Sequence, residues 1–390
     1  MKRIYLTIIG LALGLSALAQ GGAEALLLEI EANNPDLKAA LAELEQERLA
    51  NRSEALLADP EVEFNYLWGP ADIGNRHDLR ITQSFDMATL SGKRSGKVAG
   101  LDELSALKYK SRRLEVMQEA RRLIIDLIYY HKYLQELADH LDRSTTLVDA
   151  YERRLASGGA TILDLNKAKL HQASIQGRIN QAENERQSAL AGLTALNGGK
   201  APSFIPEDYD AADTLPADFE SWFAEASAQN PVLAYVRKEL EVSQQQLSID
   251  RLSTMPELTV GYMSEIQTVE RFRGVTVGVS VPLWSGANRV KRSRADVAAA
   301  QSRQDAAEQA FYQRIQDLYR QAAAMKANAG TLRASLTDTD YRDYLLSALT
   351  RGEISMIDYL VENDLYYEAL EQTLDAEREY RYALAALKVF

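Results

Sequence analysis

The sequence predicts a mostly α-helical protein with a small β-sheet, built from a structural unit that occurs twice in the chain. Three observations predict this fold class: an internal repeat, two pairs of alternating apolar and polar segments, and two long stretches without proline. Each unit is expected to contain, in order, a helix, two strands, a long helix and a further helix.

The composition excludes several function classes. The 390 residues have a formal net charge of −12, which argues against a nucleic-acid partner because such partners bind basic surfaces. The chain has no cysteine, which removes disulfides, thiolate metal sites and cysteine nucleophiles. No spacing of nucleophile, base and acid stands out, and His131 and His140 lie nine residues apart rather than four. We therefore expect no enzyme activity, no metal site and no cofactor.

Residues 1–19 are expected to be a signal peptide. Lys2 and Arg3 precede the apolar stretch 4–15, and Ala17-Leu18-Ala19 has the small-x-small pattern of a cleavage site. An N-terminal membrane anchor is the alternative, but the apolar stretch is short and the cleavage pattern follows it directly. The sequence therefore predicts an exported protein.

The internal repeat defines the expected domains. Asn34-Pro35 recurs as Asn230-Pro231, an offset of 196 positions, and Gly158 recurs as Gly352, an offset of 194. One two-residue difference in length therefore accounts for the whole alignment. We predict a first repeat over 20–200, a linker or equatorial segment over 201–228, and a second repeat over 229–390.

Each repeat is expected to contain a pair of strands, over 61–87 and 257–283. Apolar and polar residues alternate in these segments, and each strand has about the length that crosses a membrane. An ordinary soluble sheet with one buried face would show the same alternation. Aromatic residues near the strand ends are typical of membrane interfaces; they are Tyr66, Trp68, Phe85, Tyr262 and Trp284. Four membrane strands cannot close a barrel, so several chains would have to contribute.

The strands are followed by predicted helical hairpins, over 91–199 and 286–390. In the first, a stripe of residues steps by four and three from Leu127 to Val148, as in a coiled coil; its members are Leu127, His131, Leu134, Ala138, Leu141, Thr145 and Val148. The second long helix is expected to run without a break over 288–349.

The turns of the two hairpins have matching sequences. Gly158 and Gly352 occupy the positions where a left-handed residue ends a helix. Three residues later, Thr161 with Asp164, and Ser355 with Asp358, form the pattern of a capping box. The two aspartates are expected to cap helices, and a further role requires an assembly that places the turns around something.

The segment that leads from the fourth strand into the next helix resembles the strand-to-helix signature of a known family. Val277-Gly-Val-Ser-Val-Pro-Leu-Trp-Ser-Gly-Ala-Asn-Arg289, the paired turns and the duplicated layout are similar to those of the TolC-type outer membrane efflux proteins. The resemblance implies a homotrimer with a twelve-stranded β-barrel in the cell outer membrane and an α-helical barrel in the periplasm. It also implies contacts with outer membrane lipid, a periplasmic adaptor (membrane fusion protein) and an inner-membrane pump of the resistance-nodulation-division class.

The resemblance assigns roles to residues at the turns. Asp358 matches an acid that narrows the periplasmic entrance in the family, and Glu362 and Asp164 are the other candidate gate residues. The adaptor-docking surfaces would be the helix tips, at Gly158, Thr161, Gly352 and Ser355. Two positions depart from the family pattern: a second gate acid is replaced by Val361, and a basic residue by Ile354.

The expected function is therefore a passive outer membrane channel that completes a tripartite efflux or export system. The alternative is a soluble periplasmic coiled-coil adaptor or scaffold. Adaptors normally contribute a single helical hairpin, whereas this chain duplicates hairpin and strands together. The sequence does not identify the cargo.

Overall fold

The computed structural model describes residues 22–388 except 73, 212, 268–269, 283–285 and 337–340. The predicted signal peptide, residues 1–19, and Trp284 lie outside the described residues. The helices are α1 (Ala23–Asn33), α2 (Pro35–Ser53), α3 (Met87–Leu90), α4 (Lys93–Ala156), α5 (Ile162–Leu196), α6 (Phe219–Gln229), α7 (Pro231–Leu252), α8 (Gly286–Ser335), α9 (Tyr341–Arg351) and α10 (Met356–Leu387). The strands are β1 (Glu61–Leu67), β2 (Arg76–Phe85), β3 (Glu257–Ile266) and β4 (Arg271–Ser280).

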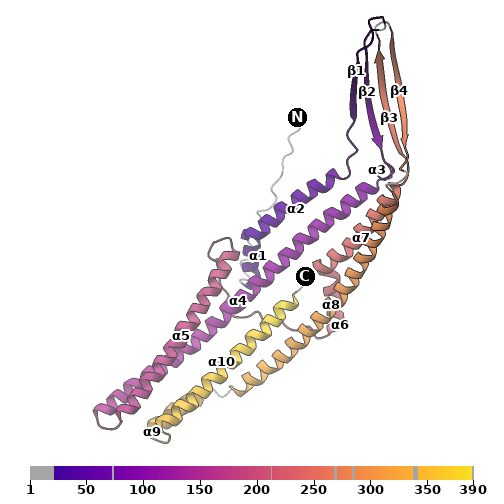
Figure 1. The fold of residues 1–390 in the computed structure, drawn as a ribbon. Helices are drawn as coiled ribbons and strands as arrows, with labels where there is room; N and C mark the ends of the chain where they lie inside the picture. The colour runs from indigo at the N-terminus through magenta and orange to yellow at the C-terminus, as the bar shows by residue number, and fades with distance from the viewer. Residues whose placement is uncertain are drawn as a thin grey trace. The chain divides into compact units, whose positions relative to one another are not determined.

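The described chain is mostly helical with one small antiparallel sheet, as the sequence predicted (Figure 1). None of the helices in the described parts of the chain combines the length and the apolar character needed to cross a membrane.

The chain forms two compact units, and each draws segments from both sequence repeats. The helical unit contains Met1–Lys38, Arg113–Ala224 and Gln313–Phe390, as far as these are described. The sheet unit contains Ala39–Arg112 and Glu225–Tyr312. Residues far apart in sequence therefore pack together in both units.

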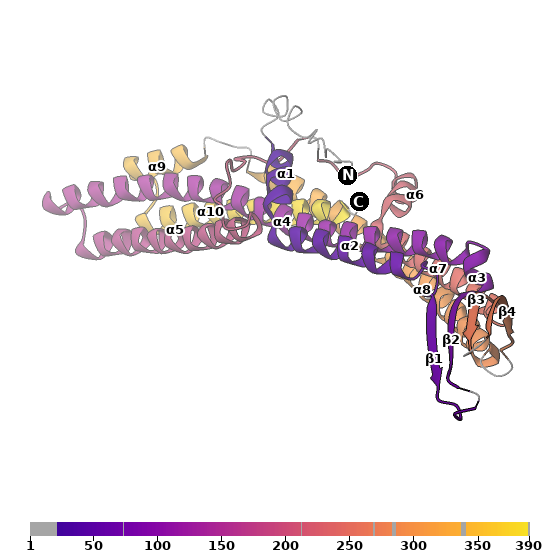
Figure 2. The same cartoon turned by 90° about the horizontal axis from the view of Figure 1, so that it is seen from above.

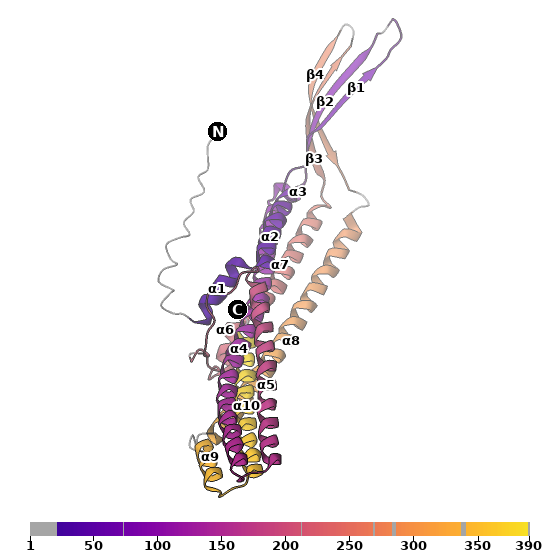
Figure 3. The ribbon, with the colours of Figure 1, turned by 90° about the vertical axis from the view of Figure 1, so that its left-hand side faces the viewer.

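The helical unit has a core along α4. Near α1, the buried residues come from α1, the start of α2, α4 and α5 and include Leu26, Ile30 and Leu127. Further along, Tyr133 and Leu137 of α4 pack with Leu374 of α10. Figure 2 and Figure 3 show α5 and α10 running beside α4 in this unit. The long helix is thus stabilised by neighbours from both halves of the chain.

The predicted coiled-coil stripe on α4 is buried at its two ends, Leu127 and Val148, but its middle is out of register with the buried face. Ala138 and Thr145, which the prediction placed in the seam, are exposed. The buried positions step by four and three one residue earlier along the helix; they are Tyr133, Leu137, His140, Ser144, Leu147 and Tyr151. Both stripes contain one histidine and one serine or threonine, so residue type alone does not distinguish them.

The second long helix is interrupted, contrary to the prediction of one helix over 288–349. Helix α8 ends at Ser335 and α9 begins at Tyr341. Leu336 forms a turn after α8, and residues 337–340 lie outside the described residues.

The repeated Asn-Pro pairs begin helices in both repeats. The Asn34 side chain accepts a hydrogen bond from the Leu37 amide at 2.9 Å, at the start of α2. The Asn230 side chain accepts from the amides of Val232 and Leu233, at 3.0 and 2.9 Å, at the start of α7. Each asparagine satisfies donors that the first turn of a helix leaves without a partner.

The sheet unit holds the four described strands in the order β1-β2-β3-β4, with every neighbouring pair antiparallel. The central pairing of β2 with β3 joins the two repeats; Ile81 lies opposite Tyr262 there. Many apolar side chains of the sheet are exposed, among them Phe64 of β1 at 62% and Val277 of β4 at 67%. Strands β1 and β4 form the edges, and among the described residues neither has a hydrogen-bonded strand on its outer side.

Candidate functional site

The two hairpin turns have the same backbone geometry. Gly158 and Gly352 have φ angles of +76° and +75°, the left-handed conformation that favours glycine. The residue after each glycine donates its amide to a carbonyl five residues earlier, Gly159 to Arg154 at 2.7 Å and Glu353 to Ala348 at 2.9 Å. The first turn joins α4 to α5, and the second joins α9 to α10. Both helices therefore end with the cap that the sequence predicted.

Both predicted capping boxes are present. The Thr161 hydroxyl accepts from the Asp164 amide at 3.2 Å, and the Asp164 carboxylate accepts from the Thr161 amide at 3.1 Å. Ser355 and Asp358 make the same two contacts, each at 3.2 Å. The hydroxyls of Thr161 and Ser355 also donate hydrogen bonds to the carboxylates of Asp164 and Asp358, respectively. These contacts begin α5 and α10 immediately after the turns.

The capping contacts keep both aspartates ionised. The hydrogen bond from the Thr161 hydroxyl, followed by that from its amide, lowers the pKa of Asp164. The Ser355 hydroxyl and amide lower the pKa of Asp358 in the same way. Asp358 is exposed and Asp164 partly exposed. Each tip therefore presents a fixed negative charge at neutral pH.

The two tips share one hydrophobic core within the helical unit. Its buried residues come from four helices, and they are Leu147, Val148, Tyr151, Leu165, Ala168, Leu345, Leu349, Met356 and Tyr359. Ile354, at the position where the resemblance expects a basic residue, packs against this core. An apolar contact thus replaces a surface charge at the second tip.

Asp139 connects three helices near this core. Its carboxylate accepts hydrogen bonds from Arg143 of α4 at 3.1 Å, Arg342 of α9 at 2.7 Å and Tyr367 of α10 at 3.0 Å. Partial burial raises the pKa of Asp139, but the hydrogen bonds from Tyr367 and Arg143 outweigh it, and the net pKa is lower than usual. Arg143 also binds Asp343 of α9, at 2.8 Å.

Glu362 lies one turn after Asp358 on α10 and is also engaged. Its carboxylate accepts the hydroxyl of Tyr341 at 2.6 Å, which ties the start of α9 to α10. Val361, where the resemblance expects a second acid, is 60% exposed. The structure thus places two of the three candidate gate acids on the first two turns of α10.

The aromatic residues of the strands differ in exposure. Trp68 is 83% exposed, Tyr66 and Tyr262 are each 41% exposed, and Phe85 is half-buried. Tyr66 stacks on His77 with ring centroids 6.2 Å apart. The described aromatics are thus largely accessible on a single chain.

The structure also brings together residues that the sequence did not connect. His140 of α4, His171 of α5 and Asp364 of α10 form a cluster in the helical unit. Burial lowers the pKa of His140 to about 3, so its ring is neutral at physiological pH. Their positions 140, 171 and 364 are too widely spaced for a short sequence motif to have indicated the cluster.

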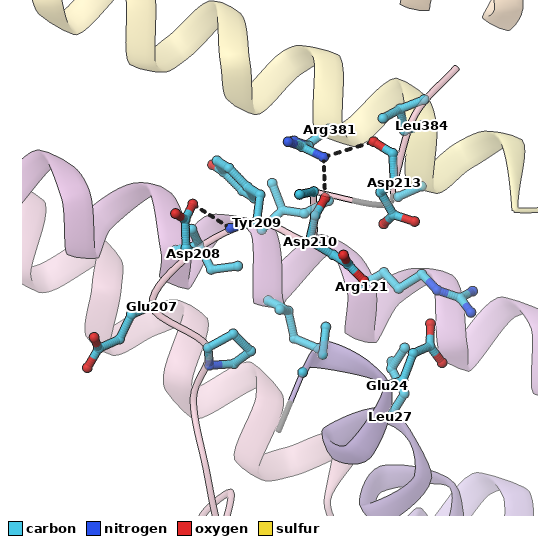
Figure 4. A pocket seen from close by; sticks show the side chains of 18 of the residues that line it. Glu24, Leu27, Arg121, Glu207, Asp208, Tyr209, Asp210, Asp213, Arg381 and Leu384 are labelled. Carbon is cyan, nitrogen blue, oxygen red and sulfur yellow. Dashed lines mark hydrogen bonds between the residues drawn. The ribbon is translucent and has the colours of Figure 1, made fainter. Parts of the chain in front are cut away.

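A cavity of about 690 Å³ lies in the helical unit between α1, α4, α10 and the linker (Figure 4). Arg381 donates from Nη1 to the carbonyls of Asp210 and Asp213, at 3.0 and 3.1 Å, and so holds the linker against α10. Burial lowers the pKa of Arg121, whose Nε has no hydrogen-bond partner among the described residues. Acids and bases line the cavity together, and this mixture does not select one class of ligand.

Two characterised proteins are similar in sequence to this chain, while no family model matches it. The cobalt-zinc-cadmium resistance protein CzcC of Cupriavidus metallidurans is 26% identical over 198 residues, which are 50% of this chain and 47% of CzcC. The alkaline protease secretion protein AprF of Pseudomonas aeruginosa is 24% identical over 263 residues, which are 61% of this chain and 53% of AprF. The chain spans about half the length of these curated relatives.

Solved structures share the fold over nearly the whole chain. The CmeC outer membrane channel of Campylobacter jejuni has a TM-score of 0.75 at 15% identity and covers 94% of this chain and 84% of its own. The outer membrane protein VceC of Vibrio cholerae has a TM-score of 0.76 at 15% identity and covers 95% of each chain. At these identities the likeness establishes the fold: a mostly helical chain with a small antiparallel sheet, as in outer membrane channels.

Proposed function

We propose that the chain forms the outer membrane channel of a tripartite system. The chain belongs to the TolC-type outer membrane efflux proteins. These proteins lie in the cell outer membrane and have a helical part in the periplasm. The chain conducts substrate passively from a periplasmic adaptor and an inner-membrane pump to the exterior. Substrate selection then depends on the charge and width of the passage, and the chain catalyses no reaction.

The observation that carries the proposal is the exposed apolar sheet with two open edges. Val275 and Val277 of β4 are 76% and 67% exposed, and Phe64 of β1 is 62% exposed. Apolar surface of this kind is unfavourable in water, and a sheet within a bilayer must pair all its edges. Contact with lipid would remove the apolar side chains from water, and pairing with other chains would satisfy the backbone groups at the two edges.

A homotrimer meets this requirement. Three copies of the four described strands give a twelve-stranded barrel, in which β4 of one chain pairs with β1 of the next. The aromatic residues Tyr66, Trp68, Phe85, Tyr262 and Trp284 would lie at the two membrane interfaces. The helices would continue as an α-helical barrel in the periplasm.

Asp358, Glu362 and Asp164 are the proposed gate residues at the periplasmic entrance. The lowered pKa of Asp358 and of Asp164 supports this role, because three chains would present rings of carboxylates that stay charged. The tips at Gly158, Thr161, Gly352 and Ser355 are the proposed adaptor-docking surfaces. The exposed side chains beside each turn support this assignment, since they are accessible to another protein.

The inner-membrane partner is proposed to be a pump of the resistance-nodulation-division class, as the resemblance implies. The names of the two relatives point to different cargoes, metal cations for CzcC and a protease for AprF. We therefore propose a route of transport for this protein and no particular cargo. A soluble periplasmic adaptor or scaffold is not favoured, because the sequence relatives are named resistance and secretion proteins and the similar solved structures include the CmeC outer membrane channel.

Reconstitution into a planar lipid bilayer tests the proposal. We expect discrete conductance steps from the purified protein, and protein that inserts without conducting would contradict a channel.

The gate is tested with Asp358→Ala, which should raise conductance and weaken block by multivalent cations because it removes a ring of charges. Ser355→Ala is the matched control, since it removes the hydroxyl of the same cap and keeps the carboxylate. An equal effect of the two variants would assign Asp358 a capping role only.

A further inference from the structure

His140, His171 and Asp364 bring three potential metal ligands together from three helices. One ring nitrogen of each histidine and one carboxylate oxygen all lie within 4.8 Å of one another. The three side chains belong to α4, α5 and α10. Two imidazoles and a carboxylate form a ligand set that suits Zn²⁺ and related divalent transition-metal cations.

His140 is buried with one ring nitrogen unsatisfied. The residue is 1% exposed, and its Nδ1 has no hydrogen-bond partner among the described residues. Its ring stacks on Tyr367 with centroids 3.6 Å apart, which fixes its plane. The Asn363 side-chain nitrogen Nδ2 lies 2.9 Å from Nε2. A half-turn of this amide brings its oxygen Oδ1 to the same place. Nε2 then carries the single proton of the neutral ring and donates it to Oδ1, and Nδ1 presents a free lone pair.

His171 has a partner at each nitrogen. Its Nε2 lies 2.9 Å from Asp364 Oδ1, and its Nδ1 lies 3.4 Å from the Ser144 hydroxyl. Metal-bound histidines usually make a hydrogen bond through the nitrogen that does not bind the metal. Asn363 and Ser144 are in position to provide this second contact for His140 and His171, respectively.

An ordinary ion pair explains only part of this cluster. Contact between His171 and Asp364 would stabilise the packing of α5 against α10 without a metal. It leaves Nδ1 of His140 buried without a partner, a costly arrangement that proteins generally avoid. A cation bound by Nδ1 of His140 together with His171 and Asp364 would satisfy this nitrogen as well.

We propose that His140, His171 and Asp364 bind a divalent transition-metal cation of the Zn²⁺ class, with water as a fourth ligand. Zn–N and Zn–O distances of 2.0–2.2 Å place tetrahedral ligands about 3.3 Å apart, so small side-chain rotations must close the cluster. The Asp364 side chain is 58% exposed and gives the cation a route from solvent.

The bound cation would fasten α10 to the α4–α5 hairpin. Each ligand comes from a different helix, so the cation stabilises the packed form of the helical unit and has little affinity for the unfolded chain. The nearby Arg178 binds Tyr133 and Glu371, and that carboxylate offsets its positive charge. This inference concerns the helical unit of a single chain and does not depend on the proposed channel function.

Zinc titration of the full-length protein tests the site. The chelator-treated protein is titrated with ZnCl₂ by calorimetry, and CoCl₂ is used in parallel to read the visible absorption of bound Co²⁺. We expect one saturable site per chain and a rise in the thermal midpoint of unfolding with Zn²⁺. His171→Gln and Asp364→Asn should each weaken binding at least tenfold and remove the thermal shift, while circular dichroism shows that the variants remain helical.

His131→Gln is the matched control, because His131 lies on the same helix, bonds to Gln135 and stands outside the cluster. This variant should bind Zn²⁺ as the unmodified chain does. The absence of saturable binding to the unmodified protein would overturn the proposal. Binding that persists unchanged in the double variant His171→Gln/Asp364→Asn would do so too, by assigning the cation to other groups.

Discussion

The helical unit and the sheet unit differ in how much of their apolar surface is buried within a single chain. In the helical unit, Leu137 and Leu193 are buried to 1% and 0% exposure, and the tips share a core of their own. In the sheet unit, every residue of β1 is exposed, and apolar residues of β4 such as Val275 face outward. The helical unit thus resembles a soluble protein, and the sheet unit requires an environment that one chain does not provide.

The difference in exposure implies different responses to substitution. Side chains in the helical unit should affect the folding of one chain, and apolar side chains of the sheet should affect insertion and assembly. The four predictions below test this distinction, beginning with the largest expected effect.

Leu137→Ala should lower the free energy of unfolding by about 2–5 kcal/mol, because it opens a cavity between α4, α5 and α10. Denaturant titration followed by circular dichroism measures the change. Leu170→Ala is the control, since Leu170 of α5 is 72% exposed and should cost less than about 0.5 kcal/mol. Equal effects of the two substitutions would remove the evidence for a self-contained helical unit.

Val277→Lys should hinder membrane insertion by about 2 kcal/mol, because it places a charge on the proposed lipid-facing side of β4. The measurement is the fraction of protein that inserts into lipid vesicles from denaturant. Thr276→Lys is the matched control, because neighbouring strand residues point to opposite faces of a sheet. If Thr276→Lys hindered insertion as much, the assignment of the two faces would be wrong.

Thr161→Ala and Ser355→Ala should each lower the free energy of unfolding by about 1 kcal/mol, because each removes one capping hydroxyl. The two tips have matching cap geometry, so the losses should be equal within the error of a denaturation experiment. A loss confined to one tip would show that the two turns do not have equivalent structural roles.

Acidification should weaken the helical unit through Asp139. Its folded-state pKa lies below the ordinary value of 3.8, so its stabilisation is present above that value and is lost as pH falls through the folded pKa. The side chain is 40% exposed, and solvent screening limits the effect to about 1 kcal/mol. Unfolding measured from pH 7 down to well below pH 3.8 should show a shallower loss in Asp139→Asn, and an unchanged slope would contradict the assignment.

Local sequence signals predicted the parts of this fold that depend on a few adjacent residues. The left-handed glycines and the capping boxes are examples, since Thr161 and Asp164 satisfy each other within one helical turn. The strand pairs were also predictable, because alternation has a period of two along each strand.

Features that depend on distant residues were not predicted. The register of the α4 seam depends on which residues of α5 and α10 face it, and burial of the polar His140 and Ser144 is evident only from that packing. The cluster of His140, His171 and Asp364 likewise forms only when three helices meet. The division into two compact units crosses both repeats and was invisible to an alignment of the repeats.

The oligomeric state in the membrane fraction tests the account most directly. Envelope fractions of cells that express the full-length gene are separated, and the protein is compared with and without heating on a detergent gel. We expect protein in the outer membrane fraction that migrates as three chains when unheated and as one chain after heating. A single chain found entirely in the soluble periplasmic fraction would contradict it.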